Sequence, residues 1–166
     1  MPCLRALLIC LFSAMASLPS VALEVPNGPP ILTVSGEIGA ANMGAVAVFD
    51  RAMLEALDWR EIETYTPFTD GPQKFAGPTL ASLLETIDVD SGTLMATALN
   101  DFSIGIPVSD ADAYDVLLAL DHNGRAMRMR EKGPIWVIYP SDSADVIDDE
   151  LGSRMIWQLD RIQVQR

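Results

Sequence analysis

The chain has 166 residues, of which 49% are apolar, and it carries 11 basic and 23 acidic side chains. This apolar content is sufficient for a packed core and argues against intrinsic disorder. The net charge of −12 repels phosphate backbones and anionic lipid, which argues against nucleic-acid binding. The sequence contains one histidine, and its two cysteines, Cys3 and Cys10, lie near the N-terminus.

The first 22 residues have the pattern of a secretory signal peptide. Arg5 supplies a positive charge, and residues 6–13 form an apolar run that is too short to span a bilayer, which needs about 20 residues. Small residues then precede Leu23 at the expected cleavage point. An uncleaved anchor is the alternative, whereas a lipoprotein attached through Cys10 is disfavoured by the bulky residue before it. We therefore expect cleavage before Leu23 and a soluble periplasmic protein.

The predicted mature chain, residues 23–166, has a length typical of one domain and contains no cysteine. It therefore has no disulfide, no cysteine nucleophile and no thiolate ligand for a metal. Zinc sites and histidine-based triads are also disfavoured, because the single histidine, His122, is predicted to be a solvated turn residue. The acidic run from Asp145 to Glu150 lacks the spacing and glycine of an EF-hand loop, so it is predicted to be a solvated helix face.

Apolar spacing predicts short strands and helices in the first half of this chain. A β-rich run is followed by a Gly- and Ala-rich loop, and Asp50 and Thr79 are each placed to cap a helix. Two prolines and two glycines before Pro78 favour a long structured loop between these helices. The expected elements are a strand at 31–34, a loop at 36–44, a helix after Asp50, a strand at 62–66, a loop at 67–78 and a helix at 80–87.

The second half is predicted to be mainly β-structure. Asn123-Gly124 is the strongest short hairpin signal in the chain. Because strands do not alternate regularly with helices, the pattern indicates a mixed α+β domain rather than a doubly wound parallel sheet. The expected elements are strands at 94–99 and 102–107, runs at 116–120 and 126–130 around the turn, a strand at 135–139, an acidic helix at 142–150 and a closing strand at 156–164.

Four segments place polar or aromatic side chains where a strand begins or ends, and they are candidates for a binding site. Each also has a structural explanation, since Asn-Asp pairs form turns, tryptophan fills cores and arginine pairs with carboxylates. The segments are 66–71 (Thr-Pro-Phe-Thr-Asp-Gly), Asn100-Asp101, 133–140 (Gly-Pro-Ile-Trp-Val-Ile-Tyr-Pro) and 153–159 (Ser-Arg-Met-Ile-Trp-Gln-Leu).

Taken in order, and together with Phe75-x-Gly-Pro-x-Leu-x-x-Leu-Leu at 75–84, these segments resemble the small secreted members of the sulfite oxidase-type molybdopterin-binding domain family. The resemblance extends from about residue 31 to residue 164. It implies an α+β fold with a mixed, partly barrel-like sheet, and a pterin as ligand.

One departure from the family concerns the metal. In the enzymes of this family a cysteine before the Gly-x-Pro-Leu-type helix ligates molybdenum, and its position corresponds to the region from Thr64 to Thr66, nearest to Tyr65. Neither a threonine nor a tyrosine replaces a soft sulfur ligand, so sulfite oxidase chemistry and bound molybdenum are disfavoured. The resemblance to members without this cysteine implies a non-enzymatic, periplasmic pterin-binding protein that acts on a membrane-bound sensor.

The resemblance and the chemistry of a pterin together assign the candidate site residues. A pterin presents an amino group beside a ring N–H, a pair of donors that a carboxylate accepts. We expect Asp101 to accept this pair, Asn100 to contact the polar edge and Arg154 to donate to the carbonyl oxygen. The aromatic side chains expected to stack on the ring are Phe68, Tyr139 and Trp157.

A basic stripe, Arg128-x-Arg130-x-Lys132, is expected to put three cations on one face of a strand, as a contact for an anion or a partner. Pairing with surface carboxylates explains the stripe equally well.

The leading hypothesis is therefore a protein that binds a reduced pterin and relays ligand state. The alternatives are an oxidoreductase, or a subunit of one, that retains molybdopterin without the cysteine, and an interaction module whose pocket is filled by its own side chains.

Overall fold

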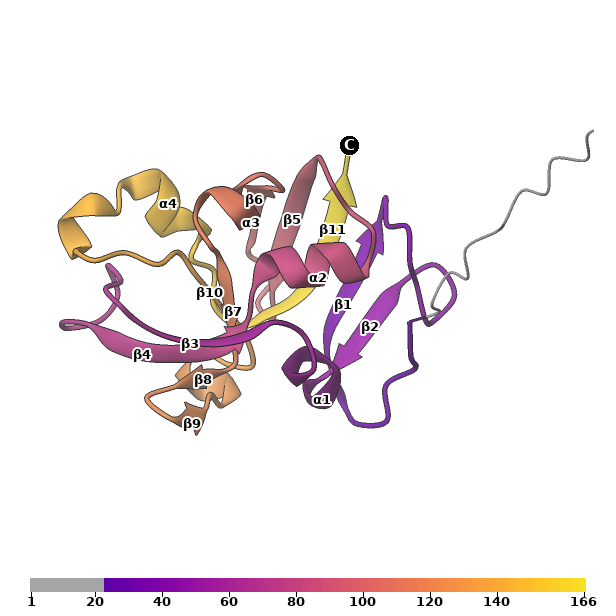
Figure 1. Cartoon of the computed structure of the whole chain (residues 1–166), viewed down its shortest axis with the longest axis horizontal. Coiled ribbons are helices and arrows are strands. Elements are labelled where there is room, and N and C mark those ends of the chain that lie inside the picture. Colours follow the sequence, from indigo (N-terminus) through magenta and orange to yellow (C-terminus); the bar gives the residue numbers. More distant parts are fainter. Residues whose placement is uncertain (1–22) are drawn as a thin grey trace, which may run out of the picture.

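The computed structural model describes residues 23–166, so the predicted signal peptide lies outside the described residues. Short strands dominate, with four α-helices and two 3-10 turns between them (Figure 1). The helices are α1 (Arg51–Glu55), α2 (Leu80–Thr86), α3 (Asp110–Ala113) and α4 (Asp149–Arg154), and the 3-10 turns are η1 (Met129–Glu131) and η2 (Ala144–Val146). The strands are β1 (Pro30–Gly36), β2 (Ala47–Asp50), β3 (Trp59–Thr64), β4 (Gln73–Pro78), β5 (Thr93–Ala98), β6 (Ser103–Pro107), β7 (Leu117–Ala119), β8 (Asp121–His122), β9 (Arg125–Ala126), β10 (Trp136–Ile138) and β11 (Leu159–Gln165).

The strands form three sheets. The largest has the order β2-β1-β11-β5-β6, in which β1 and β11 are parallel and the other neighbours antiparallel. A second sheet pairs β10 with β7, and a third has the order β3-β4-β8-β9. The predicted mixed α+β class is therefore confirmed. The sheet was also expected to be partly barrel-like, but none of the three sheets closes into a barrel within residues 23–166.

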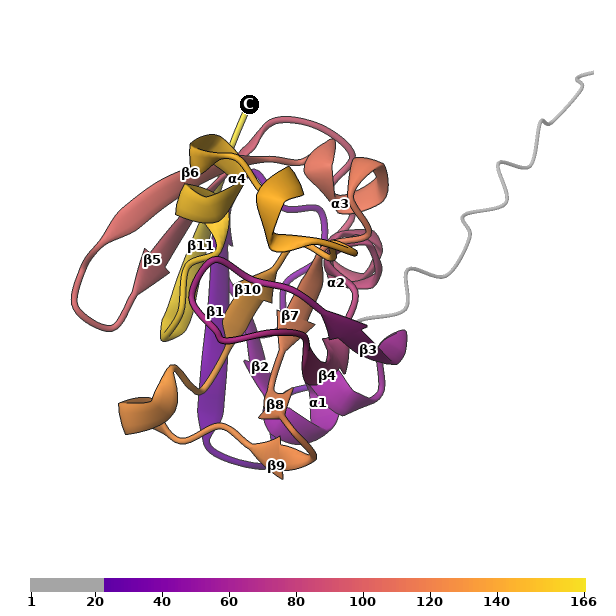
Figure 2. The same cartoon turned by 90° about the vertical axis from the view of Figure 1, so that its left-hand side faces the viewer.

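Two hydrophobic clusters hold these sheets together. The larger lies between the five-stranded sheet and α2, which crosses one side of it in Figure 1, and includes Leu32, Leu83 and Ile162. The smaller cluster surrounds Phe75 and Trp136, where the third sheet meets the β7–β10 pair. The β5–β6 hairpin projects from the edge of the large sheet in Figure 2, which leaves its turn accessible.

Local signals in the sequence predicted several boundaries correctly. The Asp50 carboxylate accepts a 2.9 Å hydrogen bond from the Met53 N–H and caps α1. The Thr79 hydroxyl accepts a 3.2 Å hydrogen bond from Ser82 N–H and caps α2 in the same way. Asn123 and Gly124 both have positive φ angles and connect β8 to β9, as expected for an Asn-Gly hairpin.

Residues 67–78 were expected to form a loop, but their second half is strand β4. This strand pairs with β3 on one side and with β8 on the other, and such tertiary pairing outweighs the local effect of proline and glycine. Gly77 suits this central position, because a Cβ there would lie 1.9 Å from the backbone oxygen of Leu118.

The basic stripe is not a strand. Residues 129–131 form the 3-10 turn η1, and Lys132 follows it in the left-handed conformation at φ 85°. Arg128 pairs with Glu131 inside this turn, whereas Lys132 faces aromatic rings. The alternation of side chains along a β-strand therefore does not apply here, and the prediction that the three cations share one face of a strand is wrong.

Candidate functional site

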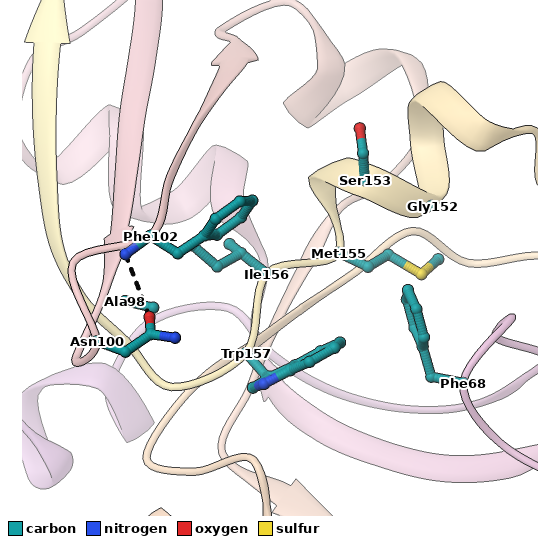
Figure 3. A pocket seen from close by; sticks show the side chains of 9 residues that line it. All are labelled: Phe68, Ala98, Asn100, Phe102, Gly152, Ser153, Met155, Ile156 and Trp157. Atoms are coloured by element: carbon teal, nitrogen blue, oxygen red, sulfur yellow. Dashed lines mark hydrogen bonds between the residues drawn. The ribbon is translucent and has the colours of Figure 1, made fainter.

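A pocket of about 370 Å³ opens between the β3–β4 loop, the β5–β6 turn and the segment after α4 (Figure 3). Its size lies within the range of small-molecule sites in proteins. The wall is mainly apolar, and its polar side chains are Asn100 and Ser153. The lining residues are Phe68, Ala98, Asn100, Phe102, Gly152, Ser153, Met155, Ile156 and Trp157.

The chain positions Trp157 through the start of β11. Trp157 forms an isolated antiparallel bridge with Trp136, and the Leu159 N–H donates to the Ile135 carbonyl at 3.0 Å. The indole N–H of Trp136 donates to the Met155 carbonyl at 3.0 Å. The segment that carries Met155 and Trp157 is thus fixed along β10, while the Trp157 side chain remains 37% exposed.

Two loops supply the other aromatic groups. Phe68 follows a turn in which its N–H donates to the hydroxyl of buried Thr66, and its ring meets that of Trp157 edge to face at 5.2 Å. Phe102 is placed by the β5–β6 turn, where its N–H donates to Asn100 Oδ1 at 3.2 Å. Phe68 and Phe102 are 40% and 52% exposed, so neither ring is part of the packed core.

A lysine completes the aromatic cluster. Lys132 Nζ lies 3.9 Å from the ring centroid of Trp157, 4.8 Å from that of Trp136 and 5.7 Å from that of Phe68. Burial lowers the pKa of this ammonium from its ordinary value of 10.5, and within residues 23–166 it forms no salt bridge. The ring faces therefore stabilise the Lys132 charge in place of a carboxylate.

The structure brings three of the six predicted site residues to the pocket. Phe68, Asn100 and Trp157 line it, although they come from loops about 30 to 90 residues apart in the chain. The neighbouring Asp101 lies at the tip of the β5–β6 turn with φ 65° and is 84% exposed, and it accepts a 2.6 Å hydrogen bond from Arg161.

Tyr139 and Arg154 lie away from the pocket lining, in a separate polar cluster. The Tyr139 hydroxyl donates to Asp110 Oδ2 at 2.7 Å, and Arg154 Nη1 donates to the same oxygen at 2.9 Å. Burial, followed by the bond to Asp110, raises the pKa of Tyr139 well above its usual value, so the hydroxyl remains a donor. These two side chains hold α3, α4 and β10 together.

Four residues at the site are not among the six predicted side chains. Met155 and Ile156 belong to the candidate segment 153–159 but were not chosen as ligand contacts, and Phe102 belongs to a run that indicates an ordinary strand. Lys132 was assigned to a basic stripe, and its position over Trp157 depends on the left-handed turn after η1.

In the region expected to hold a molybdenum ligand, the two threonines bond within the protein, and the backbone N–H of Tyr65 between them donates to the Ser141 carbonyl at 3.1 Å. Thr64 Oγ1 donates to the Ser141 carbonyl at 2.9 Å and accepts from the Ser141 N–H at 2.6 Å, and Thr66 bonds to Thr69. Within residues 23–166 no group of three or more histidine, cysteine or carboxylate side chains is placed to hold a metal ion. None of these side chains is a thiolate, so they do not fit molybdenum that is held through sulfur.

The acidic run and the histidine have structural roles. Asp148 caps α4 by accepting a 2.8 Å hydrogen bond from Leu151 N–H, and Asp145 and Glu150 are exposed. The acidic helix expected at 142–150 is wrong in its bounds, because the 3-10 turn η2 comes first and α4 begins only at Asp149. His122, in contrast, was predicted to be solvated but is half-buried. It stacks on Phe75 at 4.9 Å and 9°, because β8 pairs with β4 and brings the two rings together.

No helix within residues 23–166 has the length and apolar character needed to cross a membrane.

Comparison with known proteins supports the fold. No protein-family model matches the sequence, and no curated protein matches it either. The structure is similar to the crystal structure of the sulfane dehydrogenase SoxCD from Paracoccus pantotrophus, with a TM-score of 0.62 and 18% sequence identity. The match covers 86% of this chain but only 40% of the SoxCD chain, so this chain spans less than half of that protein. This likeness shows the fold alone, which is a sulfite oxidase-like α+β fold.

Proposed function

We propose that the chain is a periplasmic, non-enzymatic protein that binds a reduced pterin and relays the ligand state to a membrane-bound sensor. The observation that carries the proposal is the pocket beside Trp157, where exposed aromatic rings and one amide surround a space for a flat molecule. Stacking on aromatic side chains stabilises flat heterocycles in proteins, and a few polar groups then fix their orientation.

The residues in the pocket divide naturally between these two roles. Trp157, Phe68 and Phe102 offer ring contacts, and the Asn100 amide lies at the same pocket wall. The Asn100 Nδ2 group has no protein partner within residues 23–166, so it is free to donate to a ring nitrogen or carbonyl of the ligand.

The lining supports binding rather than catalysis. None of its nine residues is an acid, a base or a thiol, and the one hydroxyl, on Ser153, donates to the Glu150 carbonyl at 2.7 Å and has no base in the lining to activate it. The proposed relay and periplasmic location rest on the N-terminal pattern and on the family resemblance of the sequence.

A second candidate is an oxidoreductase or oxidoreductase subunit with an atypical molybdopterin site. Its support is the structural likeness to SoxCD, a dehydrogenase. Stoichiometric molybdenum in protein from its native source would favour it. The third hypothesis, a pocket filled by its own side chains, requires Phe68 and Trp157 to be buried, and both are more than a third exposed beside an open pocket.

Calorimetric titration of the mature chain with 7,8-dihydropterin under anaerobic conditions tests the proposal. We expect a dissociation constant of about 1 μM or tighter, equivalent to about −8 kcal/mol. Trp157→Ala should weaken binding at least tenfold, about 1.4 kcal/mol. Tyr114→Ala is the matched control, because Tyr114 is 43% exposed but lines a different hollow. If the folded Trp157 variant binds 7,8-dihydropterin as tightly as the wild type does, the indole does not contact the ligand and the proposed site is wrong.

A further inference from the structure

One surface segment of this acidic protein, residues 125–132, is positively charged. Residues 23–166 contain every basic residue except Arg5, ten in all, against 23 acidic residues. Four of the ten lie within residues 125–132, accompanied by the single acid Glu131, which is paired with Arg128. Arg125 and Arg130 are exposed and have no ion pair within the described part of the chain. The β9–η1 segment therefore presents a local positive field to solvent.

An apolar hollow of about 210 Å³ lies next to these cations. Its walls include Met129 from η1, Leu99 from the β5–β6 hairpin, and Ile31 and Pro134. Met129 is 63% exposed and Leu99 is 42% exposed, which is unusual for two large apolar side chains that line the same hollow. Asp160 also lines it; its Oδ1 atom is buried without a hydrogen-bond partner in the described residues and lies 3.6 Å from Arg161 Nε, so a peptide here has to approach with its apolar side chain rather than a carboxylate. We call Leu99, Met129, Arg125 and Arg130 the η1 patch.

Gln158 connects the η1 patch to the pocket. It follows Trp157 directly in the chain and has a φ of 55°. Its carbonyl accepts from the Leu99 N–H at 2.9 Å, its N–H donates to the Lys132 carbonyl at 2.9 Å, and its side-chain amide donates to the Met129 carbonyl at 2.5 Å. Both walls of the hollow are therefore hydrogen-bonded to the residue after the pocket tryptophan. Gln158 is therefore a direct covalent and hydrogen-bonded connection between Trp157 and the patch.

We propose that the η1 patch is a docking surface for an acidic protein segment, which inserts one apolar side chain between Leu99 and Met129, and that pterin binding at Trp157 alters this docking through Gln158. The docking surface stands on its own charge and shape, whereas its control by ligand rests on the proposed function. Arg125 and Arg130 supply long-range attraction for acidic residues, and the hollow supplies a central apolar anchor.

A membrane is the other anionic partner that a basic, apolar patch suggests. The net charge of −12 opposes any anionic partner and does not separate the two, so the preference for a protein rests on shape. The hollow is concave and of a size for a single side chain, whereas membrane insertion uses a protruding apolar face.

The test uses ¹⁵N-labelled mature chain and a short synthetic peptide in which one leucine is flanked by glutamates on both sides. We expect NMR shift changes confined to the region of Leu99, Met129 and Arg130, and an affinity that falls at least tenfold when salt is raised from about 0.05 M to about 0.5 M. Peptides with serine for leucine, or lysine for glutamate, should bind at least tenfold more weakly.

Arg130→Glu and Met129→Ser should each lower the affinity for the acidic peptide at least tenfold, while the affinity for 7,8-dihydropterin stays within twofold of the wild-type value. Arg166→Glu, a charge reversal at the C-terminus, is the matched control and should leave peptide binding unchanged. Saturating 7,8-dihydropterin should change the peptide affinity at least threefold in the wild-type chain. Gln158→Asn shortens the amide that bonds to Met129 and tolerates the positive φ, so it should reduce that change.

Three outcomes would overturn the proposal. They are shift changes elsewhere on the surface or none, equal binding of the acidic and lysine peptides, and preferential binding to vesicles of phosphatidylcholine and phosphatidylglycerol. If the peptide binds as expected but its affinity is the same with and without 7,8-dihydropterin, the proposed coupling through Gln158 is wrong. If 7,8-dihydropterin itself does not bind while the peptide does, the proposed function fails and the docking surface remains.

Discussion

The hydroxyl of Tyr139 donates a 2.7 Å hydrogen bond to Oδ2 of Asp110, and both side chains are buried. Arg154 donates to the same carboxylate oxygen, so a single acid on α3 holds a tyrosine from the end of β10 and an arginine from the end of α4. This cluster fixes the helix that leads directly into the pocket segment at Met155. The pocket is thus supported by a polar network that the ligand need not touch.

Asp110→Ala should be among the most destabilising substitutions of a polar residue in this chain. It leaves the largely buried Arg154 guanidinium without its buried partner, and removing one member of a buried ion pair costs about 3–5 kcal/mol. Urea unfolding of the mature chain measures the loss. The matched control is Glu150→Ala, which removes the other, 71% exposed partner of Arg154 and should cost less than about 1 kcal/mol. Equal losses for the two variants would contradict a structural role of the Asp110 cluster.

The single histidine predicts a pH dependence of stability. Burial, followed by the nearby charge of Lys132, lowers the pKa of His122 below its ordinary value of 6.5, so folding favours the neutral ring. The resulting stability is complete above pH 6.5 and is lost as the pH falls through the lowered folded pKa, because the unfolded chain binds the proton more readily.

His122→Phe should keep the stacking on Phe75 and remove this titration. Free energies of unfolding at about pH 7.5 and about pH 5.5 should therefore differ less in the variant than in the wild type. An identical pH dependence in both proteins would show that His122 does not titrate differently on folding.

Lys132→Met should destabilise the fold by about 1 kcal/mol, because it removes the ammonium from the faces of Trp157 and Trp136 but keeps an apolar chain of similar length. Lys132→Arg retains a cation and should recover most of that stability. Thermal unfolding of the three proteins, with tryptophan fluorescence as the probe, measures the difference. If the methionine variant is as stable as the wild type, the cation–π contacts contribute nothing to folding.

Asn100 and Asp101 are adjacent, but the structure gives them different surroundings. Asn100→Ala should weaken 7,8-dihydropterin binding about tenfold, since its amide lines the pocket and one lost hydrogen bond costs about 1–1.5 kcal/mol. Asp101→Asn should change the affinity by less than about threefold, because Asp101 lies outside the lining and contacts Arg161. Asparagine also tolerates the positive φ at that position. A tenfold loss of pterin affinity in the Asp101 variant would show that the Asp101 carboxylate contacts the ligand, as the sequence alone predicts.

The features that the sequence predicts well are those decided within a few residues. The caps at Asp50 and Thr79 and the Asn123-Gly124 hairpin each depend on one short-range hydrogen-bond or φ preference. Strand β4 was missed because its conformation depends on β3 and β8, one of which lies more than 40 residues away in the chain.

In the candidate site too, the sequence predicts features that depend on local signals and misses those that depend on tertiary packing. Phe68, Asn100 and Trp157 stand out as aromatic or polar groups at the ends of strands, and they do meet in one pocket. Tyr139 and Arg154 have equally distinctive sequence positions, yet they bond to Asp110, and only the packing of α3 against β10 and α4 reveals that partner. The place of Lys132 over Trp157 depends in the same way on the turn that follows η1.

The central claim, that the pocket beside Trp157 holds a pterin without a metal, is tested most directly by analysing the protein purified from its native source. Mass spectrometry and fluorescence identify the small molecule that accompanies it, and elemental analysis measures molybdenum in the same sample. The account predicts a pterin in near-stoichiometric amount and no molybdenum. Stoichiometric molybdenum with a dithiolene pterin, or the absence of any pterin together with no binding of added 7,8-dihydropterin, would contradict it.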